Sequence, residues 1–168
     1  GAAVVVSREV VVGDARQIVV ADTLAALGQI AQAWRLKWNP KVVALTGSNG
    51  KTTVKEMCAA ILRTAVGEDA VLATAGNFNN EIGMPLTLLR LQAAHKVAVL
   101  EMGMNHFGEL ARLTQIAQPD VALVTTQGSK TLALPGLEQA PPSHPFAFPL
   151  RSGFASPRVQ LRCPAGDS

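Results

Sequence analysis

The segment that most constrains the fold of this chain is residues 41–53, which read K-V-V-A-L-T-G-S-N-G-K-T-T. Residues 42–46 are apolar and mostly β-branched, which is typical of a buried strand. A tight turn containing Gly47 and Gly50 follows, and Lys51 then opens a segment with helical spacing. The sequence therefore predicts a strand, a turn and a helix in immediate succession.

A turn of this kind suits a triphosphate. Backbone N–H groups must converge on the phosphate oxygens without Cβ atoms in the way, and the two glycines supply that freedom. Lys51 would place a positive charge on the outer phosphates, and the hydroxyl of Thr52 could bind their Mg²⁺. The usual spacing G-x-x-x-x-G-K-[ST] requires glycine at Leu45, so the loop is a shortened version and an ordinary strand-to-helix turn is the alternative. Its position between an apolar strand and a helix favours phosphate binding.

Strands and helices alternate along the rest of residues 41–126. The apolar patterns predict further strands over 70–74, 95–101 and 121–125. Helices are predicted over 51–66, within 75–90 and over 107–117. Connections of this length indicate parallel βαβ crossovers rather than hairpins. The predicted fold class is therefore α/β, with a P-loop-type, doubly wound, mostly parallel sheet.

Ligands of such sheets bind at the carboxyl ends of the strands. Three features fall there: the 47–51 turn, the asparagine-rich segment 77–80, and Glu101 at the end of the 95–101 strand. We expect the functional site at this edge.

The first forty residues carry a different pattern. Valine-rich segments in residues 1–20 predict short strands. Asp22 is the predicted N-cap of a helix through Lys37, whose apolar residues recur at helical spacing. Trp34 and Trp38 are interpreted as packing residues at a domain junction rather than as a platform for a ligand.

Charge and cysteine content indicate no nucleic-acid or metal-cluster function. Residues 1–126 hold 11 Lys and Arg against 10 Asp and Glu, with no basic stripe interleaved with aromatics. No apolar run reaches the roughly 18 residues that span a bilayer, so a cytoplasmic location without membrane contact is expected. Cys58 and Cys163 are isolated, and Cys58 is predicted to be a core residue of its helix.

The composition changes after Thr126. Seven of the ten prolines lie in residues 127–168, and the alternation of strands and helices stops. No element is predicted there. The working hypothesis is a tail that is disordered, translated out of frame, or fused from an unrelated sequence.

Four motifs occur in order along the chain: T-G-S-N-G-K-T-T (46–53), N-F-N-N-E-I-G-M-P-L-T-L-L (77–89), E-M-G-M-N-H-F-G-E-L (101–110) and P-D-V-A-L-V-T-T (119–126). Together they resemble the Mur ligase family of bacterial peptidoglycan synthesis. The resemblance covers residues 1–126. It implies that residues 1–38 end a small α/β domain that binds the UDP-sugar, that 39–126 are part of an ATPase domain, and that 127–168 have no family counterpart.

Within the family the motifs are most similar to those of enzymes that join D-alanyl-D-alanine to UDP-N-acetylmuramoyl-tripeptide. The resemblance implies ATP and Mg²⁺ as cofactors, those two compounds as substrates, and a monomer. It also implies that a chain lacking the later family motifs is inactive by itself. The alternatives are a nucleotide-binding remnant without catalysis and a ligase similar to folylpolyglutamate synthetase, against which the 77–89 motif argues.

The resemblance assigns roles to individual residues. Lys51 is expected to hold the β- and γ-phosphates, and Thr52 and Glu101 to bind the metal. The remaining loop residues are expected to surround the phosphates; they are Gly47, Ser48, Asn49, Gly50 and Thr53.

For three further residues, two alternative roles stay open. Asn80 is expected to contact the phosphate or acyl-phosphate region, which would give it a catalytic role with Lys51 and Glu101; forming a turn is the alternative for Asn80 and for Asn77. For Glu101 the alternative is a solvated acid at a strand end. For His106 a structural role is favoured over contact with substrate or metal.

Overall fold

The computed structural model describes residues 3–8, 16–125 and 147–149. The elements, in chain order, are β1 (Ala3–Val6), β2 (Arg16–Val19), α1 (Thr23–Trp38), β3 (Lys41–Thr46), α2 (Lys51–Val66), the 3-10 turn η1 (Glu68–Ala70), β4 (Val71–Ala73), α3 (Gly83–Leu88), β5 (Val97–Glu101), α4 (Glu109–Ala117), β6 (Val121–Val124) and β7 (Ala147–Pro149). None of the helices in these ranges is long and apolar enough to cross a membrane.

The main sheet has five strands in the order β4-β5-β3-β6-β7. β3 lies in the middle and pairs in parallel with β5 and β6, and β4 pairs in parallel with β5. β7 pairs antiparallel with β6. The predicted doubly wound, mostly parallel α/β sheet is therefore confirmed. β1 and β2 form a separate parallel pair.

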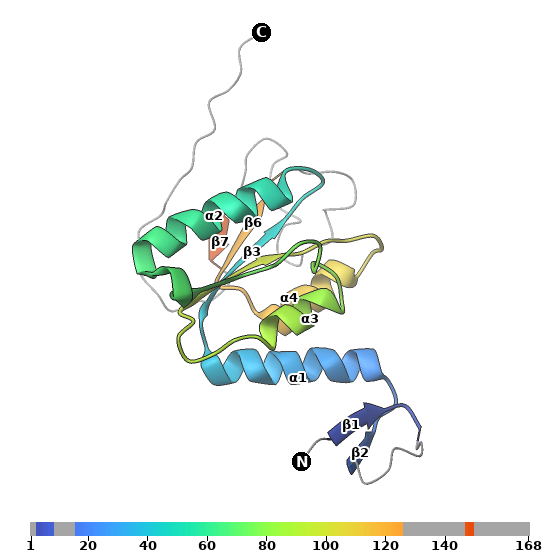
Figure 1. Ribbon diagram of the computed structural model, residues 1–168. Helices are drawn as coiled ribbons and strands as arrows, with labels where there is room; N and C mark the ends of the chain where they lie inside the picture. The colour runs from blue at the N-terminus through green and yellow to red at the C-terminus, as the bar shows by residue number, and fades with distance from the viewer. Residues whose placement is uncertain (1–2, 9–15, 126–146, 150–168) are drawn as a thin grey trace.

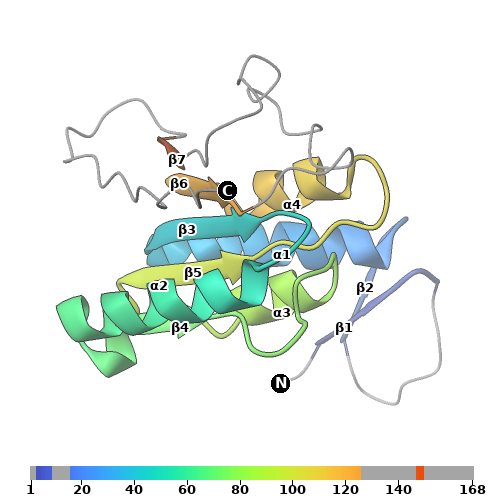
Figure 2. The ribbon, with the colours of Figure 1, turned by 90° about the horizontal axis from the view of Figure 1, so that it is seen from above.

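Both faces of the main sheet are buried, and alternate residues of each strand serve the two faces. In β3, Val42 and Ala44 pack into a core with α3 and α4, whereas Leu45 packs into a second core with α2. Figures 1 and 2 show α2 on one side of the sheet and α3 and α4 on the other, with α1 beyond them. Cys58 of α2 is half-buried against the second core, and burial raises the pKa of its thiol, which fits its predicted packing role.

Element boundaries differ from the predicted ones mainly after β4. The strand predicted over 70–74 covers only Val71–Ala73, and the helix predicted within 75–90 begins at Gly83. Residues 75–82 form the asparagine- and glycine-rich loop that leads into this helix, which therefore lies within the predicted range. β7 lies in the segment for which no element was predicted. The other expectations for 127–168, and the valine run at 10–12, lie outside the described residues.

Helix α1 begins and ends at capping residues. Asp22 Oδ1 accepts hydrogen bonds from the amides of Leu24 (2.8 Å) and Ala25 (3.1 Å), which confirms the predicted N-cap. The C-cap, Asn39, adopts the left-handed conformation with φ 46°. Trp34 and Trp38 stack edge to face and pack against the core shared with α3 and α4. The helix predicted to end a preceding domain therefore packs on the body formed by residues 41–125.

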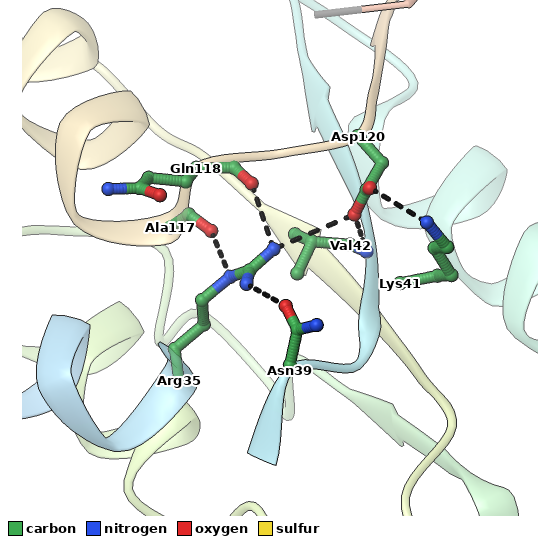
Figure 3. Close-up of polar contacts among 7 residues, drawn as sticks. All are labelled: Arg35, Asn39, Lys41, Val42, Ala117, Gln118 and Asp120. Carbon is green, nitrogen blue, oxygen red and sulfur yellow. Dashed lines mark hydrogen bonds and ion pairs between the residues drawn. The ribbon is translucent and has the colours of Figure 1, made fainter. Parts of the chain in front are cut away.

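Arg35 is the polar anchor of this packing (Figure 3). It is fully buried, and its Nε donates to the carbonyl of Ala117 (2.9 Å). Its Nη2 donates to the carbonyl of Gln118 (3.1 Å) and lies 3.6 Å from Oδ2 of Asp120, while Nη1 donates to Oδ1 of Asn39 (3.0 Å). One guanidinium thus satisfies the carbonyl end of α4 and ties it to α1.

Asp120 extends the network to the central strand. Its Oδ2 accepts from the amide of Val42 (2.9 Å), and its Oδ1 pairs with Nζ of Lys41 (3.2 Å). Because these contacts lie where β3 and β6 begin, they fix α1 at the amino edge of the sheet, opposite the loops that follow β3 and β5.

Replacing Arg35 with methionine is expected to lower the free energy of unfolding by about 3 kcal/mol, because two helix-end carbonyls and a partly buried carboxylate lose their donor. Urea unfolding measures the loss. Arg112→Met is the control, because Arg112 pairs with Glu81 at an exposed position and should cost less than about 1 kcal/mol. Equal losses in the two variants would contradict the anchoring role.

Candidate functional site

The glycine-rich loop lies at a topological switch point of the sheet. The loop that leaves β3 leads to α2 on one face, and the loop that leaves the adjacent strand β5 leads to α4 on the other (Figure 2). A crevice forms where neighbouring strands send their connections to opposite faces. The predicted placement of the 47–51 loop and Glu101 at one edge is confirmed.

The loop has the backbone conformation that its glycines permit. Gly47 has φ 138°, and Gly50, the N-cap of α2, is left-handed with φ 76°. Gly50 has no side chain with which to bond the first-turn amides of α2. These amides and the helix dipole make the loop a suitable place for an anion. Lys51 crosses the loop, and its Nζ donates to the carbonyl of Gly47 (2.7 Å).

Glu101 is buried at the end of β5, with 2% of its surface exposed. The hydroxyl of Thr52 donates to its Oε2 (3.0 Å), and Nδ2 of Asn79 donates to its Oε1 (2.9 Å). Both donors are neutral, and no ion pair of Glu101 occurs within the described ranges. The carboxylate is therefore not the solvated acid of the alternative reading.

This arrangement fits a magnesium ion. Mg²⁺ is usually held by one or two carboxylates together with phosphate oxygens and waters rather than by an all-protein cage. A buried carboxylate beside a threonine hydroxyl, next to the phosphate-sized loop, meets that requirement. No group of three or more His, Cys, Asp or Glu that could hold a metal occurs in the part of the chain described.

The asparagine-rich loop is held by its own hydrogen bonds. The side-chain oxygen of Asn80 accepts from the amides of Ile82 (3.1 Å) and Gly83 (2.8 Å), which is the turn-forming role. The carbonyl of Asn77 accepts from the amide of Asn79 (2.8 Å) within the same turn. It is Asn79 that reaches Glu101. Sequence analysis did not single out Asn79, because a pair of adjacent asparagines does not reveal which one faces the sheet.

Thr125, at the end of β6, is a second contact that sequence analysis missed. Its hydroxyl lies against the carbonyls of Thr46 (3.3 Å) and Asn49, and its amide donates to the carbonyl of Thr46 (2.9 Å). The loop is thus held from β6 as well as from its own ends. Of the other predicted loop residues, Ser48, Asn49 and Thr53 are exposed.

His106 is exposed in the loop between β5 and α4. Its amide donates to Oε2 of Glu109 (3.2 Å), and the amide of Asn105 donates to the same oxygen (2.7 Å). These two backbone hydrogen bonds lower the pKa of Glu109 below its ordinary value. Glu109 therefore closes the loop at the start of α4, as an acidic residue commonly does at a helix N-terminus.

The fold and the loop together define an α/β protein of the P-loop type. Residues 45–132 match the Mur ligase middle domain, so the chain belongs to the Mur ligase family. The match continues to residue 132, beyond Thr126, where the predicted resemblance ends.

Similar proteins agree with this assignment. The chain is 57% identical over 109 residues to the UDP-N-acetylmuramoyl-tripeptide–D-alanyl-D-alanine ligase of Haemophilus influenzae, a match that covers 64% of this chain and 24% of the relative. It is 48% identical over 122 residues to the ligase of the same name from Escherichia coli, which covers 73% and 26%. The chain therefore spans about a quarter of the length of these relatives.

Solved structures show the same relationship. MurF from Acinetobacter baumannii superposes with a TM-score of 0.69 at 43% identity, over 76% of this chain and 28% of that one. MurF ligase from Thermotoga maritima in complex with ADP superposes with a TM-score of 0.62 at 35% identity, over 70% and 27%.

The pKa of Glu109 predicts a pH dependence. A carboxyl whose pKa is lowered by folding stabilises the folded state above its unfolded pKa, and this contribution is lost as pH falls through the folded pKa. Urea unfolding between pH 7 and 3 should therefore show wild type losing more stability than Glu109→Gln as pH falls. An NMR titration of the Glu109 carboxyl provides the independent check. Parallel stability curves for the two proteins would contradict this role.

Proposed function

We propose that this chain is the ATP-binding part of a ligase that joins D-alanyl-D-alanine to UDP-N-acetylmuramoyl-tripeptide in peptidoglycan synthesis. The observation that carries the proposal is the contact between Thr52 and the buried Glu101 beside the glycine-rich loop. The printed names of the relatives supply the substrates. Those names also favour this function over one similar to folylpolyglutamate synthetase.

The loop is proposed to bind the phosphates of ATP. Backbone amides of residues 47–53 surround the phosphates, and the ammonium of Lys51 moves from the carbonyl of Gly47 to the β- and γ-phosphates. Thr52 and Glu101 hold Mg²⁺, which when bound supplies charge neutralisation to the phosphates. An ADP complex of a related MurF ligase supports a nucleotide at this fold.

The reaction follows from positioning and charge neutralisation rather than from a protein nucleophile. The γ-phosphoryl group passes from ATP to the terminal carboxylate of the tripeptide, which becomes an acyl phosphate. The amine of D-alanyl-D-alanine then attacks the acyl carbon, and phosphate leaves as the amide forms. In this chain, Lys51 orients the transferred group. Asn79 holds Glu101, and Asn80 shapes the loop that carries Asn79.

The proposal assigns nucleotide binding to this chain and the complete ligation to the longer protein. The relatives are about four times as long as the matched region. The second candidate is binding of nucleotide without catalysis.

Several finer assignments belong to the same proposal. They are a monomer, a cytoplasmic location, and a division into the end of a UDP-sugar-binding domain and part of an ATPase domain. The sequence predicts that division after residue 38, whereas the packing of α1 on α3 and α4 supports proposing it before Thr23.

Lys51→Ala is expected to weaken binding of ADP with Mg²⁺ by at least about tenfold, because a charge-assisted contact to phosphate is lost. Isothermal titration of the full chain measures the change. Lys96→Ala is the matched control, because Lys96 is an exposed lysine at the opposite edge of the sheet and should leave affinity unchanged. Equal affinities for wild type and Lys51→Ala would overturn the assignment of the loop.

Glu101→Gln separates the metal site from the phosphate site. The amide keeps the shape of the carboxylate and removes its charge, so the variant should bind ADP with the same affinity with and without Mg²⁺. Wild type should bind more tightly with the metal. Retention of the full Mg²⁺ effect in Glu101→Gln would place the metal elsewhere.

A further inference from the structure

Lys55 is a buried ammonium that the proposed chemistry does not use. It lies one helical turn after Lys51 in α2, and 1% of its side chain is exposed. Its Nζ donates to the carbonyl of Thr74 (2.7 Å) and pairs with Oε1 of Glu56 (2.8 Å). Its neighbours along α2, Ala59 and Leu62, pack into an apolar core. Burying a charge costs free energy that an apolar residue would not cost here, so packing alone does not explain this lysine.

Thr74 lies where β4 stops pairing with β5. Its amide donates to the carbonyl of Val99 (3.0 Å), as a continued parallel ladder requires. The next bond of such a ladder would run from the amide of Glu101 to the carbonyl of Thr74. Instead, the amide of Glu101 donates to the hydroxyl of Thr74 (3.0 Å), and the carbonyl accepts from Lys55. The side chain of Thr74 thus replaces its own carbonyl in the ladder.

This exchange has two consequences for Glu101. Its backbone is fixed by a buried hydroxyl, since Thr74 is 2% exposed. The chain also leaves the sheet after Thr74 and enters the 75–82 loop, which returns Asn79 to the carboxylate of Glu101. Helix α2 therefore contacts Glu101 directly through the hydroxyl of Thr52. It also contacts Glu101 indirectly, because Lys55 binds the carbonyl of Thr74 and the hydroxyl of Thr74 binds the amide of Glu101.

We propose that Lys55 and Thr74 are positioning residues that set the place of the Glu101 carboxylate for the divalent ion. The inference rests on the proposed function, because it assumes that Glu101 binds the metal. Neither residue contacts the nucleotide or the metal in this proposal. Changing either one should therefore alter the Mg²⁺ concentration that nucleotide binding requires, and leave the contacts with the phosphates unchanged.

The test measures ADP affinity of the full chain at increasing Mg²⁺ and in EDTA. Thr74→Val keeps the shape of the side chain and removes the hydroxyl. It should raise the half-saturating Mg²⁺ concentration about fivefold, the effect expected from losing one buried hydrogen bond. ADP affinity in EDTA should stay within about twofold of wild type, because the phosphate loop is untouched.

Thr74→Ser and Thr87→Val are the matched controls. Serine restores the hydroxyl, so it should return the Mg²⁺ requirement to within about twofold of wild type. Thr87 is also a buried threonine, with its hydroxyl on the carbonyl of Gly83 in α3. Thr87→Val should therefore cost stability without changing the Mg²⁺ requirement. Thermal midpoints of all variants are recorded alongside.

Lys55→Gln gives the second line of evidence and decides the matter if Thr74→Val does not fold. Glutamine is too short to hold the Thr74 carbonyl as lysine does, so the Mg²⁺ requirement should rise as in Thr74→Val. An unchanged requirement in Thr74→Val or Lys55→Gln, or an equal rise in Thr87→Val, would overturn the inference. Wild type that binds ADP without any Mg²⁺ effect would instead overturn the proposed metal site, and the inference with it.

Discussion

A carboxylate buried at the end of a parallel strand has to be matched by donors, because an unpaired buried charge is costly. Glu101 is in that position, and two donors from two segments meet its carboxylate: the hydroxyl of Thr52 and the amide group of Asn79. The backbone amide of Glu101 in turn donates to the hydroxyl of Thr74, which fixes the end of the strand. Both of these side-chain donors are neutral. The carboxylate therefore has no cationic partner among the described residues, and the hydrogen bonds at the carboxyl edge of the sheet hold it in place.

The amino edge of the sheet holds the body together by different means. Arg35 joins α1 to the end of α4 and, through Asp120, to the start of β3. One edge thus carries a fully paired cation that fixes the helices, and the other carries a carboxylate without a cationic partner among the described residues. The buried β3 strand connects the two edges and leads directly into the glycine-rich loop. The contacts that hold the helices together therefore lie at the start of β3, and the proposed phosphate and metal site lies at its end.

Much of this architecture could be predicted from the sequence, because periodicity and turn residues report local structure. The β3 strand, the loop, the start of α2 and the N-cap at Asp22 followed from residues within a few positions of one another. The predictions that failed concern features that depend on contacts between residues far apart in the sequence. β4 is shorter than predicted because Lys55 takes the carbonyl of Thr74. The choice between Asn79 and Asn80 likewise required the position of Glu101, and β7 pairs with β6 through a non-local contact.

The central claim is that Glu101 and Thr52 form a divalent-ion site beside the phosphate loop. A crystal structure of the chain with ADP and Mn²⁺, read by anomalous scattering, tests it most directly. The account predicts an anomalous peak bound to the Glu101 carboxylate and the Thr52 hydroxyl, with the present hydrogen bond between them replaced by the ion. A peak held by the phosphates alone, with the Thr52–Glu101 hydrogen bond intact, would contradict it.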